Sequence, residues 1–368
     1  MKEVQLREVV DVYDNLRKPL STMTRLGIQG KYPYYSANGA IDSINKFIFS
    51  GEYILVAEDG SVRTDDGKPV VKLTKKDEQF WVSNHAHVLR AKEGILNKYL
   101  YYNLSQVNVD QIITGAVQLK VSQENLLKLK VKLHSFDEQQ HIVDTIGTVD
   151  DLIEKNEEII ANARSLINAF YDTIIVETGI SILKDFFVIT IGRTPPTKES
   201  KWFSSSSRGN VKWLSIKDMA QNSTYIFETS QFLTNDALKK FNIPIVKEGD
   251  VLLSFKLTVG RTAIAGANMV TNEAIACFKA NPEYRNYLFC YLQRCNFLSD
   301  GDNTSSIGKA VNSTIIRNFP FVIPSKESLD TFNKETHSLF ELIKLKQKEN
   351  ISLKTQKGTL LCKYFSSN

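Results

Sequence analysis

Residues 121–135 read Val121-Ser-Gln-Glu-Asn-Leu-Leu-Lys-Leu-Lys-Val-Lys-Leu-His-Ser135, and residues 311–325 read Val311-Asn-Ser-Thr-Ile-Ile-Arg-Asn-Phe-Pro-Phe-Val-Ile-Pro-Ser325. At an offset of 190 residues, the two stretches match or stay apolar at Val121, Leu129, Val131, Leu133 and Ser135. The offset continues downstream, where Leu152-Ile153 aligns with Leu342-Ile343. The chain is therefore an internal duplication of a globular part followed by a regular helix. Two different versions of one unit in one chain predict a target with two parts.

The composition allows two folded domains. The chain has 368 residues, of which 42% are hydrophobic and 24% charged, enough to bury two ordinary cores. A formal net charge of +5 and a pI of about 8.8 permit an anionic partner without requiring one.

Charge is unevenly distributed along the chain. Between Leu183 and Lys217, seven Lys and Arg residues face only Asp185 and Glu199. This stretch either follows phosphates or forms an ordinary solvated loop, and both readings stay open. The segment from Asp137 to Glu158 instead holds eight carboxylates and a single lysine, which makes it unsuited to nucleic acid.

Residues 137–175 carry the clearest helical pattern. Apolar residues recur at alternating steps of four and three, with one polar residue, Asn156, in the seam. This heptad pattern predicts a coiled coil in which the seam asparagine fixes the register. A weaker seam runs from Phe332 to Tyr364, so the partner is expected within the same chain. A pseudo-two-fold relation between the copies would make the two helices antiparallel.

The first globule reads as mixed α/β. Short apolar runs at residues 47–49, 52–57 and 80–89 are expected to be strands, and residues 97–107 a short helix. The predicted fold class is α/β (α+β), with two tandem mixed domains that are each followed by a long helix. The expected boundaries are residues 1–135 for the first domain, 136–178 for the central helix, 179–325 for the second domain and 326–368 for the distal helix.

The four cysteines all lie in the second copy, which argues against a disulfide framework or a shared metal site. Buried free thiols in a reducing compartment are the expectation. The N-terminus does not resemble a secretion signal, and no apolar run approaches the ~18 residues of a membrane span. A soluble, cytoplasmic protein without a membrane partner is therefore expected.

Signals of catalysis are mostly missing from the sequence. The segment Gly301 to Lys309 misses the spacing of a phosphate-binding loop and reads as a Ser-rich loop. His85 and His87 flank Ala86 and are expected on one strand face, but a third metal ligand is not nearby, so no metal site is predicted. The only Pro-Pro pair, Pro195-Pro196, lacks the flanks of a base-methylation motif. The sequence thus indicates a non-catalytic chain without a cofactor of its own.

Characteristic segments occur in both copies. In the first they are Tyr32-Pro-Tyr-Tyr-Ser-Ala-Asn-Gly39, Gly51-Glu-Tyr-Ile-Leu-Val-Ala-Glu-Asp-Gly60 and Trp81-Val-Ser-Asn-His-Ala-His-Val-Leu89. In the second they are Thr194-Pro-Pro-Thr-Lys198, Val211-Lys-Trp-Leu-Ser-Ile-Lys-Asp-Met219, Gly249-Asp-Val-Leu-Leu-Ser-Phe255 and Thr271-Asn-Glu-Ala-Ile275. Together with Phe136-Asp-Glu-Gln-Gln-His-Ile142, these segments resemble type I restriction-modification specificity subunits over essentially the whole chain. The second helix departs from the family pattern, because residues 325–330 lack the Glu-Gln pair.

The resemblance implies a subunit that reads a split site in double-stranded DNA, one half per recognition domain. It further implies helices that act as a spacer and as a docking site for methyltransferase subunits, which bind S-adenosylmethionine, and a restriction subunit joining that core. Two alternatives stay open: a coiled-coil scaffold with two protein-binding globules, and a stand-alone DNA methyltransferase. Salt-dependent duplex binding would favour the specificity subunit over the scaffold.

Site residues are expected in turns beside the matched strands and on the acidic helix. The candidates for contact with bases or phosphates are polar and basic, namely Ser36, Asn38, Ser61, Arg63, Lys198, Lys217, Lys256, Thr258 and Arg261. The candidates for docking a methyltransferase subunit are acidic, namely Asp144, Asp151, Glu154 and Glu158.

Overall fold

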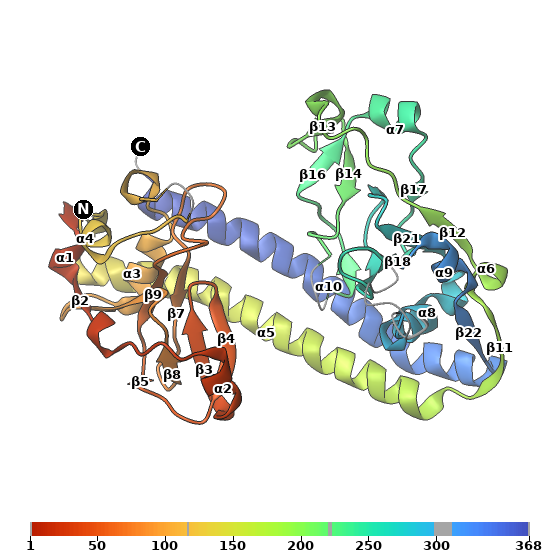
Figure 1. Cartoon of the computed structure of the whole chain (residues 1–368), viewed down its shortest axis with the longest axis horizontal. Coiled ribbons are helices and arrows are strands. Elements are labelled where there is room, and N and C mark those ends of the chain that lie inside the picture. Colours follow the sequence, from red (N-terminus) through yellow and green to blue (C-terminus); the bar gives the residue numbers. More distant parts are fainter. Residues whose placement is uncertain (1, 116–117, 220–222, 298–310, 367–368) are drawn as a thin grey trace. The chain divides into compact units, whose positions relative to one another are not determined.

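The computed structural model describes residues 2–115, 118–219, 223–297 and 311–366 (Figure 1). The segment Gly301 to Lys309 lies outside the described residues. The chain divides into two compact units: unit 1 holds Met1–Ile153 and Leu353–Asn368, and unit 2 holds Glu154–Ser352. The two long helices contribute residues to both units.

Unit 1 is built on small sheets. One has the strand order β2-β9-β6-β7, another the order β4-β3-β8-β5, and β1 pairs with β10. The strands are β1 Lys2–Gln5, β2 Val10–Val12, β3 Gln29–Ser36, β4 Gly39–Ile44, β5 Phe49–Ser50, β6 Ile54–Ala57, β7 Val71–Leu73, β8 Gln79–Val82, β9 Ala86–Ala91 and β10 Lys130–Leu133. The short helices are α1 Leu6–Val9, α2 Thr22–Leu26, α3 Asn97–Leu104 and α4 Gln123–Leu127, with 3-10 turns η1 Asp14–Leu16 and η2 Asp110–Ile112. Ser21 and Ser122 cap α2 and α4 by accepting from the backbone amides of Thr24 and Asn125.

Unit 2 repeats this plan with additions. One sheet has the order β12-β21-β18-β19-β15, another the order β13-β16-β14-β20-β17, and β11 pairs with β22. The strands are β11 Glu177–Ile182, β12 Val188–Ile191, β13 Phe203–Ser204, β14 Val211–Leu214, β15 Tyr225–Ile226, β16 Gln231–Leu233, β17 Ile245–Val246, β18 Val251–Ser254, β19 Thr262–Ala265, β20 Met269–Thr271, β21 Ile275–Lys279 and β22 Pro320–Pro324. The short helices are α6 Leu183–Phe186, α7 Asn235–Phe241, α8 Pro282–Arg294 and α9 Ser313–Asn318, with the 3-10 turn η3 Ser200–Trp202.

The two units share one topology down to the direction of their strands. In unit 1, β3 and β8 form a parallel pair in which Tyr35 lies opposite Val82. In unit 2, β14 and β20 form the equivalent parallel pair, with Leu214 opposite Thr271. The flanking strands β4 and β5 correspond in the same way to β16 and β17, whereas β13 and β15 have no equivalents among the described strands of unit 1. The duplication read from the sequence is therefore a duplication of fold.

The long helices α5 Phe136–Ile174 and α10 Lys326–Phe365 pack against each other within each unit. In unit 1, Ile142 and Ile146 of α5 share a buried cluster with Leu361 and Phe365 of α10. In unit 2, Tyr171 meets Phe332 edge to face with ring centroids 5.9 Å apart, and Asn156 meets Asn350. Partner numbers in α10 fall as those in α5 rise, so the helices are antiparallel. The predicted α/β fold with a pair of antiparallel helices is confirmed.

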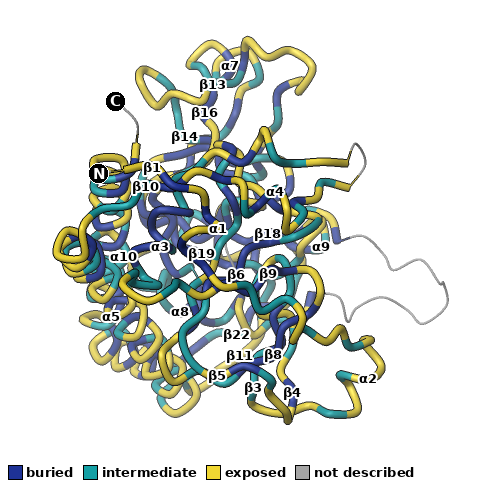
Figure 2. Tube along the Cα trace, turned by 90° about the vertical axis from the view of Figure 1, so that its left-hand side faces the viewer, coloured by how far each residue is buried: buried dark blue, intermediate teal, exposed yellow. Residues whose placement is uncertain are grey.

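Each unit has its own core, and Figure 2 colours the buried stretches of the chain dark blue. In unit 1, a cluster that includes Leu6, Ile54 and Leu89 is buried between the β2-β9-β6-β7 sheet, α1, α3 and α4. In unit 2, a larger cluster joins Val251 and Phe278 of the equivalent sheet to α8, α5 and α10. Inward-facing apolar residues on short, well-buried strands therefore hold each domain together and fix its surface loops.

Some details differ from the sequence-based expectations. Residues 80–89 form two strands, β8 and β9, because the chain turns at Ser83–His85 and β9 joins a different sheet. The expected helix at residues 97–107 ends at Leu104. Cysteine burial is incomplete, since Cys295 is half-buried and Cys362 exposed, although all four thiols are free. Burial raises the pKa of the Cys277 and Cys290 thiols to about 12, so these two are unreactive.

Candidate nucleic-acid interface

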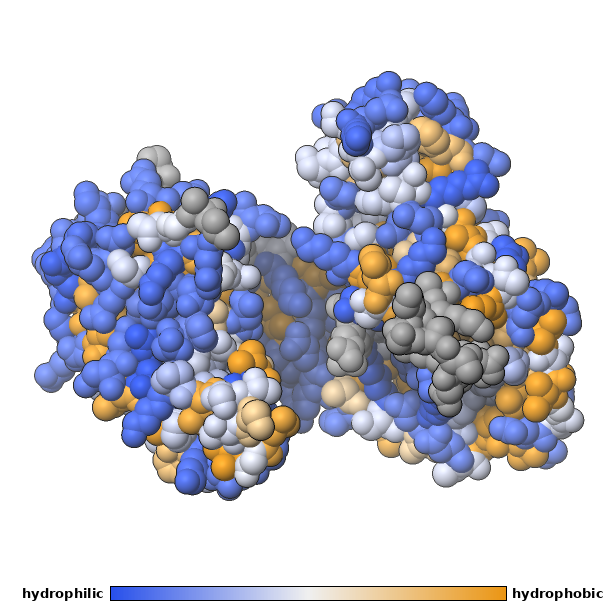
Figure 3. Space-filling model, viewed as in Figure 1, coloured by the Kyte–Doolittle hydropathy of each residue, from blue (hydrophilic) through white to orange (hydrophobic). Residues whose placement is uncertain are grey.

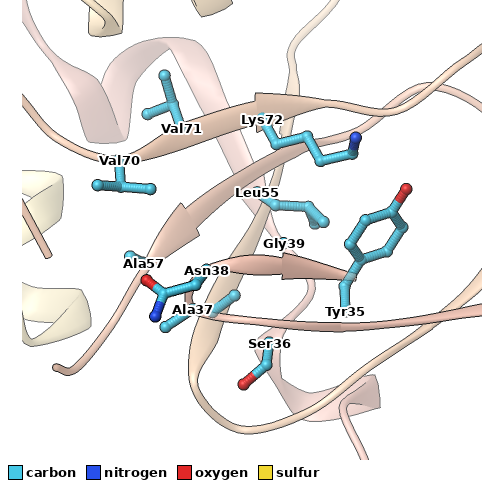
Figure 4. Close-up of a pocket in the computed structure, with 11 residues that line it drawn as sticks. Tyr35, Ser36, Ala37, Asn38, Gly39, Leu55, Ala57, Val70, Val71 and Lys72 are labelled. Atoms are coloured by element: carbon cyan, nitrogen blue, oxygen red, sulfur yellow. The ribbon is translucent and has the colours of Figure 1, made fainter. Parts of the chain in front are cut away.

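The β3–β4 turn of unit 1 carries two predicted contact residues. Ala37 and Asn38 form a tight turn, and Gly39 follows with φ +100°, a conformation that glycine adopts without steric cost. Asn38 is exposed, and the Ser36 hydroxyl lies 3.3 Å from that of Ser83. This turn forms one wall of a pocket of about 320 Å3 whose other walls come from β6, β7 and β9 (Figure 4).

Lys72 brings a positive charge to this pocket. It lies opposite Leu55 across the β6–β7 pair, and its ammonium stands 5.1 Å from the centre of the Tyr35 ring (Figure 4). Tyr35 in turn donates a hydrogen bond of 2.5 Å to Glu78, which holds the ring in place. The pocket therefore combines aliphatic walls with a cation and a polar turn. Lys72 is not among the residues predicted from the sequence, although the alternation Val71-Lys72-Leu73 is a weak strand signal.

Ser61 and Arg63 occupy the β6–β7 loop and do not line the pocket. Both are exposed, and the Arg63 guanidinium forms a 2.9 Å ion pair with Asp110. Contact with a phosphate would have to compete with this carboxylate. The structure thus separates the predicted residues of the first domain into two groups: Ser36 and Asn38 at the pocket, and Ser61 and Arg63 on the loop.

His85 and His87 do not share a face. His85 is exposed in the turn before β9 and pairs with Asp59 at 2.7 Å, whereas His87 is buried in β9. The His87 ring places Nδ1 2.6 Å from Asp14 and donates from Nε2 to the carbonyl of Val121 at 2.8 Å.

Asp14, Glu58 and His87 offer ligand atoms within 4.8 Å of one another, which is metal-site spacing. Arg17 and Lys120 pair with these carboxylates, so the group forms an ion network that ties η1 to β6 and β9. Burial by itself raises the pKa of Glu58, but Arg17, His87 and Lys120 outweigh it and hold that pKa below its usual value.

In unit 2, Arg261 joins two elements that carry predicted contact residues. Its Nη1 donates to the carbonyls of Ile216 and Met219 at 3.0 and 2.8 Å, so it fastens the turn after β14 to the end of the β18–β19 loop. That turn exposes Lys217. The β18–β19 loop exposes Lys256 and Thr258. The sequence made Arg261 a candidate for contact with bases or phosphates, and in the structure its guanidinium braces the turn after β14.

Asp218 fixes the same turn from inside. It accepts hydrogen bonds from the backbone amide and hydroxyl of Ser215 and from the backbone amide of Ser230. Burial raises the pKa of Asp218, but these hydrogen bonds outweigh it and lower the pKa. Lys217 is therefore presented from a rigid turn.

Lys198 belongs to a different segment, the turn after Thr194-Pro-Pro. It is exposed, and the segment that leads to it is anchored by Arg193, which donates to the carbonyl of Phe241 at 2.8 Å. Gly192 is required at the start of the segment, because a Cβ there would lie 2.2 Å from the carbonyl oxygens of Thr271 and Asn272.

The predicted docking residues lie on α5. In unit 1, Asp144 accepts a hydrogen bond from Gln140, and the exposed Asp151 stands 3.8 Å from Lys98. In unit 2, Glu154 is exposed and Glu158 pairs with Lys155 at 2.8 Å. All four carboxylates face solvent away from the apolar seam, as docking requires.

The surface of unit 1 is mostly hydrophilic on the face that Figure 3 shows, with hydrophobic side chains at the end where Figure 1 labels α2 and β4. Exposed apolar residues of that end are Met23, Leu26, Ile41 and Phe47. Across residues 2–115, 118–219, 223–297 and 311–366, no helix has the length and hydropathy needed to cross a membrane.

Two copies of one mixed α/β fold, each joined to a long helix, define a class of duplicated two-domain α/β proteins. The chain matches the family model described as the type I restriction modification DNA specificity domain, over residues 1–163 and 176–355. The chain belongs to this family.

Curated relatives carry names from the same family. The chain is 27% identical over 270 residues to the putative type I restriction enzyme specificity subunit S.HindORF215P of Haemophilus influenzae, a match that covers 70% of this chain and 66% of the relative. It is 22% identical over 402 residues to the type I restriction enzyme MjaVIII specificity subunit of Methanocaldococcus jannaschii, covering 96% of this chain and 91% of the relative.

A solved structure supports the fold. The type I restriction-modification system S subunit from M. genitalium aligns with a TM-score of 0.58 at 15% identity, covering 100% of this chain and 96% of that one. At this identity the likeness speaks for the fold alone.

Proposed function

We propose that the chain reads a bipartite site in double-stranded DNA, with the globule of unit 1 reading one half and the globule of unit 2 the other. The observation that carries this proposal is the repeated topology, in which β4-β3-β8-β5 and β16-β14-β20-β17 share strand order and the parallel central pair. If both domains read the same sequence, their surface loops would have no reason to differ. The loops of the two domains do differ. Loops on a fixed scaffold are where recognition diverges.

The first reading surface combines the pocket at the β3–β4 turn with Lys72. Its polar turn is suited to base edges and its ammonium to a phosphate. The second surface comprises the turn with Lys217 and the loop with Lys256 and Thr258, which Arg261 fastens together. The basic side chains supply sequence-independent attraction, and the polar side chains between them supply discrimination.

The chain itself is proposed to be non-catalytic. Methylation would come from methyltransferase subunits that bind S-adenosylmethionine and dock on the helices α5 and α10, and cleavage from a restriction subunit. The acidic carboxylates of α5 are our candidate docking face, since they are solvent-facing and repel DNA. Family membership supports this assignment of roles.

Salt dependence of DNA binding tests the proposal. The complex of this chain with its methyltransferase subunits is titrated onto a duplex at increasing salt concentration. We expect the logarithm of the association constant to fall linearly with the logarithm of salt concentration, because phosphate neutralisation releases counterions. Binding that is absent, or insensitive to salt, would favour a protein-binding scaffold instead.

A further inference from the structure

Leu257 is the most exposed large apolar residue among the described residues. It sits at the tip of the β18–β19 loop with 96% of its surface accessible, while Phe255 two residues earlier is buried. Single exposed leucines are common on protein surfaces and need no explanation by themselves. This one has a second unusual property in its backbone.

The backbone of Leu257 is strained. Its φ is +60°, and the amide of Thr258 donates to the carbonyl of Lys256 at 2.7 Å across it. This three-residue turn has the features of the classic γ-turn, which is rare and costly for a residue with a Cβ. Elsewhere in the described chain, the positive-φ residue that is not glycine is Asn242, which caps α7 and tolerates this conformation.

The loop is built to hold this conformation. The Ser254 hydroxyl donates to the carbonyl of Thr258 at 2.5 Å and accepts from the amide of Arg261 at 3.0 Å. The amide of Gly260 donates to the carbonyl of Ser254 at 2.9 Å. Both ends of the loop are thus tied together, and the tip is fixed rather than free to relax.

The equivalent β6–β7 loop of unit 1 provides an internal comparison. There the positive-φ positions are Gly60 and Gly67, the residues that adopt such a backbone at least cost. Unit 2 places a leucine where a glycine would remove the strain. Persistent strain of this kind clusters at binding and switch sites.

From this geometry we propose that Leu257 is a specificity-determining residue of the second domain, making an apolar contact with the bases of the half-site that unit 2 reads. This inference rests on the proposed function. Lys256 precedes Leu257 and Lys217 stands on the turn fastened to the same loop, so phosphate contacts would flank the apolar tip. Apolar side chains distinguish bases by packing on thymine methyl groups or base steps, and a rigid tip does so without an ordering cost on binding.

Two substitutions test the apolar side chain of Leu257 and its backbone strain. Leu257→Gly removes both, and Leu257→Asn keeps a side chain of similar size that tolerates positive φ but is polar. Val188→Ala is the matched control, because Val188 is 68% exposed on β12, at the edge of the same sheet. Each variant is purified with the methyltransferase subunits. Its affinity is measured for a cognate duplex, which carries the sequence that the complex methylates, and for a scrambled duplex, in which the second half-site is scrambled.

We expect both Leu257 variants to match or exceed the wild-type melting temperature, yet to bind the cognate duplex roughly tenfold more weakly while affinity for the scrambled duplex is unchanged. The control should behave as wild type. Unchanged cognate affinity would overturn the inference, as would equal weakening on both duplexes or a loss of methyltransferase co-purification with DNA specificity intact. If the wild-type complex itself prefers no site, the proposed function has failed rather than this inference.

Discussion

The Asn156 amide donates a 2.9 Å hydrogen bond to the side-chain oxygen of Asn350 inside the seam between α5 and α10. Both side chains are buried, so this bond satisfies the Nδ2 donor of Asn156 and the Oδ1 acceptor of Asn350 where little water can reach them. A paired seam asparagine specifies register, because sliding one helix would leave both amides unpaired among apolar side chains.

Breaking this pair should destabilise unit 2. Asn156→Ala leaves the Asn350 amide buried without its partner, and we expect a loss of about 1–3 kcal/mol in the free energy of unfolding. Replacing both asparagines with leucine should restore or raise stability, since no polar group is then stranded. Denaturant titration of Asn156→Leu, Asn350→Leu and the double leucine variant gives the coupling energy between the two positions. Additive effects of the single changes would contradict the pairing.

The two reading surfaces should act on separate half-sites. Asn38→Ala is expected to weaken recognition through the first domain, and Arg261→Ala recognition through the second, each by about 1–3 kcal/mol. Duplexes with one or the other half-site scrambled reveal which half each variant still reads. Each variant serves as the control for the other, and a shared effect on both half-sites would refute independent readers.

Arg261 needs a stability measurement beside the binding assay. Its loss removes the donor for the carbonyls of Ile216 and Met219, so Arg261→Ala should also lower the melting temperature. Lys217→Ala removes no such hydrogen bond, so it tests only the proposed contact of the Lys217 side chain with DNA. A binding defect in Arg261→Ala with normal binding in Lys217→Ala would show that Lys217 is not a contact residue and that Arg261 acts on binding directly or through the β18–β19 loop.

The acidic face of α5 should matter for assembly and not for folding. Changing Asp151 and Glu158 to lysine reverses charges on exposed side chains with weak or local partners, so the melting temperature should stay within a few degrees. Co-purification with the methyltransferase subunit at moderate salt should fall. Intact assembly would exclude this face as the docking site.

The helix pair is also proposed to set the gap between the two half-sites. Lengthening α5 and α10 by one heptad at matched positions adds ~10.5 Å of helix at ~1.5 Å per residue, about three base pairs of duplex. We expect the unread gap to grow by that amount while both half-sites stay the same. Mapping of methylated sites for the lengthened variant gives the answer, and an unaltered gap would refute the ruler.

The helices were predictable because their signal is periodic. A heptad seam from Ile142 to Ile174 constrains every third or fourth residue, and only a long helix satisfies it. The duplication was equally visible, since the segments 121–135 and 311–325 each form a short helix followed by a strand. Val121, Leu126 and Val131 are buried in the first, and Val311, Ile316 and Phe321 at the same offset in the second. Strand bounds were harder to predict. Residues 80–89 alternate well enough to be read as one strand, and only the sheet partners show that the chain turns at Ser83–His85.

The reading surfaces were predictable only in part. The Asn38-Gly39 pair predicts a turn, and the structure places Asn38 in that turn and Ser36 just before it, both lining a pocket. Lys72 and Leu257 were not predicted, because their proposed roles rest on cross-strand packing and on a backbone angle, neither of which leaves a local sequence pattern. The structure likewise reveals the bracing contacts of Arg261 through residues more than forty positions away. The nine proposed DNA-contact residues and four docking residues stay predictions.

One measurement addresses the central claim most directly: the map of methylated bases in a host that expresses this chain with its methyltransferase subunits, compared with a host that expresses the methyltransferase subunits alone. Two readers in one chain predict a methylated motif of two short fixed sequences separated by a gap of constant length and free sequence, present only when this chain is expressed. A single uninterrupted motif, or methylation that does not depend on this chain, would contradict the account.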